Sequence, residues 1–256
     1  MSCIINKWVG RFGNNLLQLV RCIYYAKNNN YKIICFPNHK LFKYNKIELE
    51  NTNDIDSYID FYNEFFDLSK FYLKDPEPYQ MKEITLKYIK PILIIKYHIE
   101  NLFSNNIFIH IRGGDIFSKN PHPAYVQPPL NYYENIINNY NFTNINIVHE
   151  DNLNPCVNLL KQNSSYNFYS QDLEKDLELL INAENLVFGF GTFGFVIYLL
   201  NDKIKKIFFP DYVINELPNG SWGDVELNII NLPNYIKVGE WKNTLEQINL
   251  IVNYKL

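Results

Sequence analysis

Apolar positions along the chain recur with the spacings of short buried strands and of amphipathic helices. Apolar or β-branched runs predict strands at residues 2–5, 31–36, 106–111, 145–149, 166–169, 186–188 and 206–209. Apolar positions three or four residues apart predict helices that begin near Asn14 or Asn15 and at residues 84–100, 130–139, 155–162, 172–182, 192–200 and 244–254. Strands that alternate with helices predict an α/β fold, with parallel sheets covered by helices on both faces.

Three stretches are less regular. Residues 40–84 mix aromatic and acidic residues with prolines and predict loops and short elements, residues 116–130 form a proline-rich loop, and residues 211–256 form a tail. We divide the chain near residue 100 into two Rossmann-like domains, 1–100 and 101–256. Ligands of such sheets bind at the carboxyl ends of the strands. Three glycine-bearing loops after predicted strands are therefore candidates for the site, at residues 10–15, 110–115 and 189–192.

Composition narrows the class of protein. The 256 residues are 47% hydrophobic and 20% charged, which excludes a wholly disordered chain. A net charge of −3 offers no basic surplus for a phosphate backbone, so a nucleic-acid partner is not expected. The four cysteines lack metal-ligand spacing and read as reduced thiols. Since neither a signal peptide nor an apolar stretch of ~20 residues occurs, we expect a cytoplasmic protein without a membrane span.

Arg112 is the strongest candidate for a functional residue. It follows a predicted buried strand, and the glycines after it let the backbone approach a ligand. A guanidinium binds phosphate oxygens in a bidentate manner, but Arg112 could equally be a structural partner of Asp115. His110 could be a hydrogen-bonded core residue or a ligand of a base or sugar, and Asp115 could be a general base or an anchor for Arg112.

Two further segments are weighed on spacing alone. Gly189-Phe190-Gly191-Thr192 precedes a helix, whose N-terminal N–H groups suit an anion. The fingerprints GxxxxGK[ST] and GxGxxG are absent, so neither a P-loop nor a dinucleotide site is indicated. Asp54-Ile55-Asp56 is a DxD pattern, whose two carboxylates could hold a divalent metal beside a diphosphate. No apolar strand precedes it, so a solvated surface segment is the favoured interpretation.

Three segments in chain order resemble motifs of the α-1,2-fucosyltransferase family. Gly10–Gln18 resembles the opening G-x-x-G-N-x-x-x-Q. His110–Asp115 looks like the H-x-R-x-G-D motif that this family shares with α-1,6- and protein O-fucosyltransferases. Asp176–Leu180, followed by Gly191–Phe193, resembles the third motif, D-x-x-x-L with S-[ST]-F-S. Glu150-Asp151 sits where the family has a strand that ends in an acidic pair.

The resemblance implies a GT-B-like fold, with two Rossmann-like domains and a cleft between them, and an inverting glycosyltransferase. Its partners would be GDP-fucose as donor and a glycan hydroxyl as acceptor, with no metal and no other cofactor. The resemblance implies that Arg112 contacts the donor's phosphate, that His110 lies near the nucleotide and that Asp176 contacts guanine. It also implies that Gly191 and Thr192 contact phosphate. Gly13 and Asn14 would face the reaction centre. Asp115 is our first candidate for the catalytic base and Glu150 the second.

The chain also departs from the family's motifs. A second basic residue after the motif arginine is replaced by Gly113, and the serine-rich loop is replaced by glycines at 189, 191 and 194. Another donor, such as UDP-xylose, and a non-catalytic carbohydrate- or nucleotide-binding protein on the same fold therefore stay open as alternatives.

The proline-rich loop and the helix after it supply three weaker candidates. We assign Tyr125, Gln127 and Tyr132 to acceptor binding, because aromatic faces suit the C–H surfaces of sugars. The alternative is a surface loop that proline stiffens.

Overall fold

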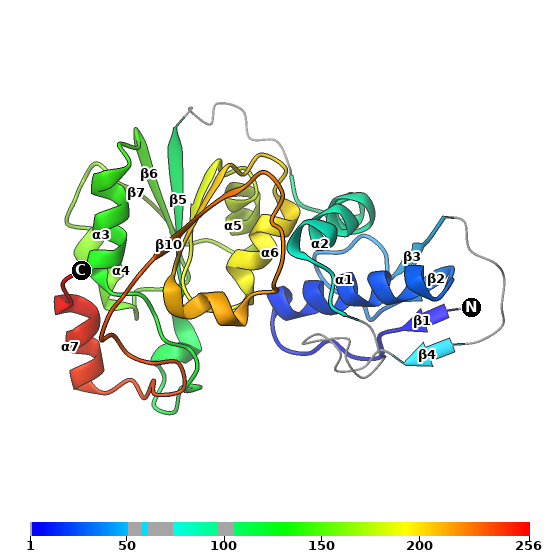
Figure 1. Cartoon of the computed structure of the whole chain (residues 1–256), viewed down its shortest axis with the longest axis horizontal. Helices are drawn as coiled ribbons and strands as arrows, with labels where there is room; N and C mark the ends of the chain where they lie inside the picture. The colour runs from blue at the N-terminus through cyan, green and yellow to red at the C-terminus, as the bar shows by residue number, and fades with distance from the viewer. Residues whose placement is uncertain (1, 51–57, 61–73, 97–104) are drawn as a thin grey trace. The chain divides into compact units, whose positions relative to one another are not determined.

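The computed structural model describes residues 2–50, 58–60, 74–96 and 105–256 (Figure 1). Its contacts divide the chain into two compact units. The first comprises Met1–Ile95, Phe195–Asp202 and Pro218–Gly223, and the second comprises Lys96–Gly194, Lys203–Leu217 and Asp224–Leu256. The sequence-based division places the two later segments of the first unit in the C-terminal domain, because it assumes that each domain is continuous in sequence.

The first unit holds a four-stranded sheet of order β3-β2-β1-β4. Its strands are β1 (Ser2–Ile4), β2 (Ile33–Cys35), β3 (Lys46–Glu48) and β4 (Tyr58–Asp60). β1 pairs in parallel with β2 and β4, whereas β3 runs antiparallel to β2. The sequence predicts short elements and loops in residues 40–84, and β3 and β4 are such short elements, with three residues each.

Helix α1 (Phe12–Asn28) connects β1 to β2 and is buried over most of its length. It begins two or three residues before the predicted Asn14 or Asn15, with Arg11 at its N-cap. Asn15 is an interior helix residue, since its side-chain amide donates to the carbonyl of Val9 at 2.9 Å. Arg21 is only 5% exposed and stays charged in the core because Asp75 pairs with it, at 3.0 Å and 3.2 Å.

The helix predicted at 84–100 starts earlier and ends earlier. α2 (Pro78–Ile84) is followed by a π-helix (Thr85–Ile89) and a 3₁₀ turn (Lys90–Ile92). Pro78 is accepted at the start of α2, where an N–H would have no helical partner. Pro91 lacks the N–H that a continuing helix needs, and the backbone is extended at Leu93.

The second unit holds a six-stranded, fully parallel sheet of order β10-β9-β8-β5-β6-β7. Its strands are β5 (Asn106–Ile111), β6 (Asn144–His149), β7 (Asn167–Tyr169), β8 (Asn185–Val187), β9 (Lys206–Pro210) and β10 (Glu226–Ile230). This order is that of a Rossmann fold, with its topological switch point between β5 and β8. The sequence pattern predicted the first five strands and missed β10, an edge strand without a fully buried residue.

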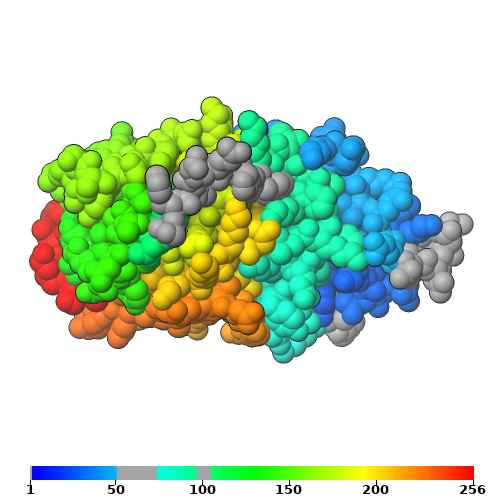
Figure 2. Space-filling view, turned by 90° about the horizontal axis from the view of Figure 1, so that it is seen from above, coloured from blue at the N-terminus to red at the C-terminus, as the bar shows by residue number. Residues whose placement is uncertain are grey.

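The helices that lie wholly in this unit are α3 (Leu130–Asn139), α4 (Pro155–Leu160), α5 (Leu173–Leu180) and α7 (Leu245–Asn253), whereas α6 (Thr192–Leu200) begins in this unit and belongs to the first unit from Phe195 onward. The buried residues of α3, α4 and α7 pack with Ile107, Ile109 and Ile111 of β5 in one core. Figures 1 and 2 both show α7 beside the green segment that contains α3. Asn154, Asp172 and Thr244 cap α4, α5 and α7 with their side chains, as expected for these residue types.

The four cysteines all lie in the described ranges and are unpaired, and Cys3, Cys22 and Cys156 are buried. Burial raises the pKa of the Cys22 and Cys156 thiols, so both stay protonated at neutral pH. In the described ranges, no helix combines the length and the apolar character that crossing a bilayer requires.

Candidate functional site

The carboxyl ends of β5 and β8 bring two of the predicted loops together in the second unit. β5 and β8 are neighbours in the sheet, with Ile109 paired to Val187. Arg112 follows the last residue of β5, while Gly189 to Gly191 follow β8 and lead into α6. The order of the strands reverses between β5 and β8, which is where Rossmann folds bind their ligands.

The Arg112 side chain is 15% exposed, and three residues lie around its guanidinium. Its Nη1 lies 3.0 Å from the place that a Cβ on Gly191 would take, so it reaches the start of α6. Its Cζ lies 4.3 Å from the centre of the Tyr125 ring, and its Nη2 lies 3.3 Å from Oδ1 of Asp115. The predicted phosphate-binding arginine and the predicted helix N-terminus are thus in contact.

Gly113 and Gly114 form the turn that carries Arg112, and Asp151 holds this turn. A Cβ on Gly113 would collide with the Asp151 carboxylate. Gly114 has a φ of +64° and donates its N–H to Oδ2 of Asp151 at 2.8 Å, while Leu153 donates to Oδ1 at 2.8 Å. The acidic pair after β6 was visible in the sequence, but this anchoring role was not.

Asn154 fixes the same turn from α4 and was missed by sequence reasoning. Its buried side chain donates to the Arg112 carbonyl at 3.1 Å and accepts the Cys156 N–H at 3.1 Å. The position just before Pro155 signals a helix cap, but not a contact with Arg112, which lies 42 residues earlier.

His110 lies at the end of β5, with its ring 4.8 Å from that of Phe193 in the first turn of α6. Burial and the nearby positive charge of Arg112 lower the pKa of His110 to about 3. The imidazole is therefore neutral at physiological pH. It could donate or accept a hydrogen bond, but it adds no positive charge for a phosphate.

Asp176 lies in the first turn of α5, which follows β7 at the far edge of the sheet from β10. Its Oδ1 is buried and has no hydrogen-bond partner among the described residues. Burial raises the pKa of this carboxyl group to about 7, against a hydrogen bond from the Gln171 backbone that lowers it. A buried acceptor without a partner fits a ligand that brings N–H donors.

The structure corrects two of the three predicted acceptor-binding residues. Tyr132 is fully buried, and its hydroxyl donates to the Phe188 carbonyl at 3.1 Å. Gln127 is 1% exposed, and its amide donates to the Tyr125 and Val126 carbonyls. Both assignments were wrong, because side chains without exposed surface cannot face a glycan, and both residues hold the loop in place. Tyr125 is partly exposed and lies on Arg112.

The glycine loop of the first unit is held by its own side chains. Gly13 is buried in the first turn of α1, and the half-buried Asn14 places its amide where a Cβ on Gly10 would lie. Gln18 donates to the Lys7 carbonyl at 3.3 Å. Gly13 and Asn14 belong to the first unit, and their role at the reaction centre stays a prediction.

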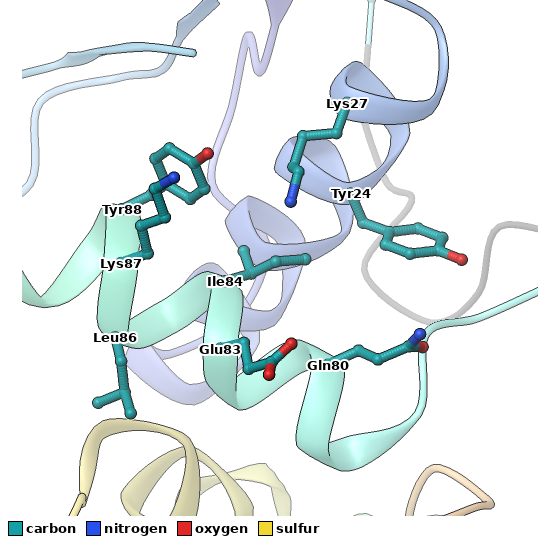
Figure 3. A pocket seen from close by; sticks show the side chains of 8 residues that line it. All are labelled: Tyr24, Lys27, Gln80, Glu83, Ile84, Leu86, Lys87 and Tyr88. Atoms are coloured by element: carbon teal, nitrogen blue, oxygen red, sulfur yellow. The ribbon is translucent and has the colours of Figure 1, made fainter. Parts of the chain in front are cut away.

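A groove of about 660 Å³ lies beside the π-helix in the first unit (Figure 3). Its lining is Tyr24, Lys27, Gln80, Glu83, Ile84, Leu86, Lys87 and Tyr88. The ammonium of Lys27 lies 5.7 Å from the centre of the Tyr88 ring, and Lys87 pairs with Glu50 at 2.8 Å. A second hollow, of about 450 Å³, is lined by residues 38–40 and 42–45. Neither is lined by a predicted site residue, so the candidate site depends on strand topology and loop contacts.

Among the residues that the structure describes, no three His, Cys, Asp or Glu side chains gather as a metal site. Asp54 and Asp56 of the DxD segment lie outside the described residues. Comparison of the chain with protein-family models, with curated proteins and with solved structures finds no match.

Proposed function

We propose that the chain is an inverting, metal-independent glycosyltransferase that transfers fucose from GDP-fucose to a glycan hydroxyl. One observation carries the proposal. The Arg112 guanidinium and the N-terminus of α6 adjoin at the switch point of a sheet with Rossmann strand order. Such a pair suits a diphosphate, and the motif resemblance supports fucose as the sugar.

Transfer of the sugar requires groups that stabilise the negative charge on the leaving diphosphate. The acceptor oxygen attacks the anomeric carbon of the sugar, the bond from that carbon to the phosphate oxygen breaks, and its electron pair leaves with the diphosphate. Arg112 and the backbone N–H groups at Gly191 and Thr192 would stabilise this charge. Because the guanidinium is largely shielded from water, its attraction for the leaving oxygens is stronger than it would be in bulk solvent.

The proton of the acceptor hydroxyl requires a base, and Asp115 is the candidate nearest to Arg112. Its carboxylate is 52% exposed and forms an ion pair with Nη2 at 3.3 Å. An exposed pair of this kind contributes little stability, so a diphosphate could displace Asp115 from the guanidinium. The displaced carboxylate would then be available to accept the proton.

Asp176 supports guanine as the base of the donor. Guanine presents adjacent N–H donors at N1 and N2, and one of them could meet the Asp176 oxygen that has no partner among the described residues. A buried oxygen without a protein partner would gain a hydrogen bond when such a base binds.

The test is a panel of nucleotide-sugars, with GDP-fucose and UDP-xylose among them, incubated with the full chain and glycan acceptors in excess EDTA. We expect GDP release from GDP-fucose that rises when an acceptor is added, and a larger thermal stabilisation by GDP than by UDP. Strict dependence on Mn²⁺ would contradict the metal-independent mechanism and would return attention to Asp54 and Asp56. If UDP-xylose is the only nucleotide-sugar turned over, UDP-xylose would replace GDP-fucose as the proposed donor.

A non-catalytic nucleotide- or carbohydrate-binding protein is the second candidate. The carboxylates around Arg112 are already engaged: Asp115 pairs with the guanidinium, and Asp151 accepts two backbone N–H groups. Binding of GDP or UDP without turnover of any sugar in the panel would favour this candidate.

A further inference from the structure

The Arg112 guanidinium has one aromatic neighbour that the proposed mechanism does not use. The centre of the Tyr125 ring lies 4.3 Å from Cζ of Arg112. A guanidinium is planar and carries all its N–H donors in that plane. The cation lies over the Tyr125 ring, which attracts it and restricts the positions that the guanidinium can take.

Tyr125 is itself held in place. Its ring lies 4.9 Å from that of His122 and 5.8 Å from that of Phe190, which belongs to the loop after β8. Its N–H donates to the His122 carbonyl at 3.0 Å. The ring is thus fixed between its own loop and the loop that leads to α6.

The C-terminal tail fixes the same loop from another direction. The N–H groups of Gly239 and Trp241 both donate to the Pro123 carbonyl at 3.1 Å. The indole N–H of the buried Trp241 donates to the Ile116 carbonyl at 2.7 Å. A loop with these anchors is a rigid platform, which is what orienting another side chain requires.

Asp115 alone would orient the guanidinium poorly. Its contacts with Nη2 are long, at 3.3 Å and 3.5 Å, and its carboxylate is 52% exposed. Water reaches the Asp115 side of this ion pair, and a diphosphate would compete for the same donors. The ring contact persists when an anion takes the place of Asp115.

We propose that Tyr125 is a positioning residue: its ring holds the Arg112 guanidinium so that Nη1 faces Gly191 and the start of α6. This inference rests on the proposed function and replaces the acceptor-binding role assigned to Tyr125 from the sequence. The aromatic face carries the effect and the hydroxyl does not, so Phe is the matched control and Leu is the disrupting substitution.

The experiment measures the Kd of GDP and of guanosine for the wild type, Tyr125→Phe and Tyr125→Leu. We expect Tyr125→Leu to weaken GDP roughly 10-fold, the effect of a cation–π contact of about 1.4 kcal/mol, and to leave guanosine unchanged. Tyr125→Phe should bind both within about 2-fold of the wild type. The double variant Arg112→Ala/Tyr125→Leu should bind GDP no more weakly than Arg112→Ala, because Tyr125 acts through Arg112.

Three results would overturn the inference: Tyr125→Leu binding GDP as tightly as the wild type, equal losses for GDP and guanosine, or equal losses in the Phe and Leu variants. Equal losses for the two ligands would mean a purely structural role. Thermal unfolding of Tyr125→Leu by circular dichroism separates this outcome from failure to fold. If the wild type binds neither GDP nor UDP, the proposed function itself fails, and this inference fails with it.

Discussion

The β1–α1 and β8–α6 connections look alike in sequence and differ in what surrounds them. Each leads from a short strand through glycines and an aromatic residue into a helix: Gly10 and Arg11 precede α1, which begins with Phe12 and Gly13, and Gly189-Phe190-Gly191 precedes α6. Both contain a glycine with positive φ, +72° at Gly10 and +119° at Gly191. Backbone conformation alone does not distinguish an anion site from an ordinary turn.

The neighbours make the distinction. Around Gly10 the space is filled by side-chain amides from the first turn of α1: Asn14 packs over the glycine, and Asn15 donates to the Val9 carbonyl. At Gly191 the nearest group is the guanidinium of Arg112, which follows β5, the neighbour of β8 in the sheet. A glycine loop therefore becomes a candidate phosphate site through the residue that tertiary structure places beside it.

Removal of the guanidinium should give the largest effect. We expect Arg112→Ala to lower transfer by ~10²–10³-fold, about 3–4 kcal/mol of transition-state stabilisation, while the fold is kept. The measurement is kcat/KM for GDP-fucose, with circular dichroism as the check on folding. Turnover at the wild-type rate would remove the phosphate role from Arg112, and with it the difference between the two loops.

The two glycines form a matched pair for the next test. Gly191→Ala and Gly10→Ala should each lower the free energy of unfolding by about 1–2 kcal/mol or more, because each puts a Cβ at positive φ, and Gly10→Ala also displaces the Asn14 amide. A Cβ on Gly191 also meets Nη1 of Arg112 at 3.0 Å, so Gly191→Ala should weaken GDP by about 10-fold or more, whereas Gly10→Ala should not. Equal effects of both variants on the Kd of GDP would contradict the distinction.

Asn15 tests the interpretation of the first loop as a self-contained turn. Asn15→Ala removes the donor to the Val9 carbonyl in a side chain that is 3% exposed, and should lower the free energy of unfolding by about 1–2 kcal/mol. Urea denaturation measures the loss, and the Kd of GDP should not change. A loss of GDP affinity without a loss of stability would assign Asn15 to ligand binding.

A test by pH concerns Asp176 in the second unit. Its folded-state pKa is about 7, above the ordinary value of 3.8, so the folded protein binds more protons than the unfolded chain between these values. Stability from this group is therefore greatest below pH 3.8 and declines as the pH rises to about 7. Asp176→Asn should flatten this decline and raise the Tm at pH 8, measured by thermal melts from pH 4 to pH 8. A Tm at pH 8 below that of the wild type would mean that the ionised carboxylate is stabilising.

The spacing of apolar residues and the turn residues were enough to predict the bounds of several core elements. The run Asn106–Ile111 and the helical spacing of Leu130–Asn139 and Thr192–Leu200 gave the observed bounds, because both faces of β5 and the inner faces of the helices are buried. The pattern failed for β10, since this strand has no run of buried residues to reveal it. It also failed to separate Tyr132 from Tyr125, because aromatic residues seven positions apart in one segment can face a core or a ligand.

The amino-acid sequence by itself indicated the α/β class and the alternation of strands and helices, and it predicted Arg112 and Gly191 as candidate phosphate-binding groups, whereas Asp176 was suggested by the motif resemblance. These properties are local: they depend on spacing, on the donors of one side chain or on the absence of a Cβ. Only the tertiary structure decided that Arg112 meets Gly191, that Tyr125 lies under the guanidinium and that Tyr132 belongs to the core. The reason is that sheet order and packing bring together residues many positions apart, and no local pattern encodes which loops become neighbours.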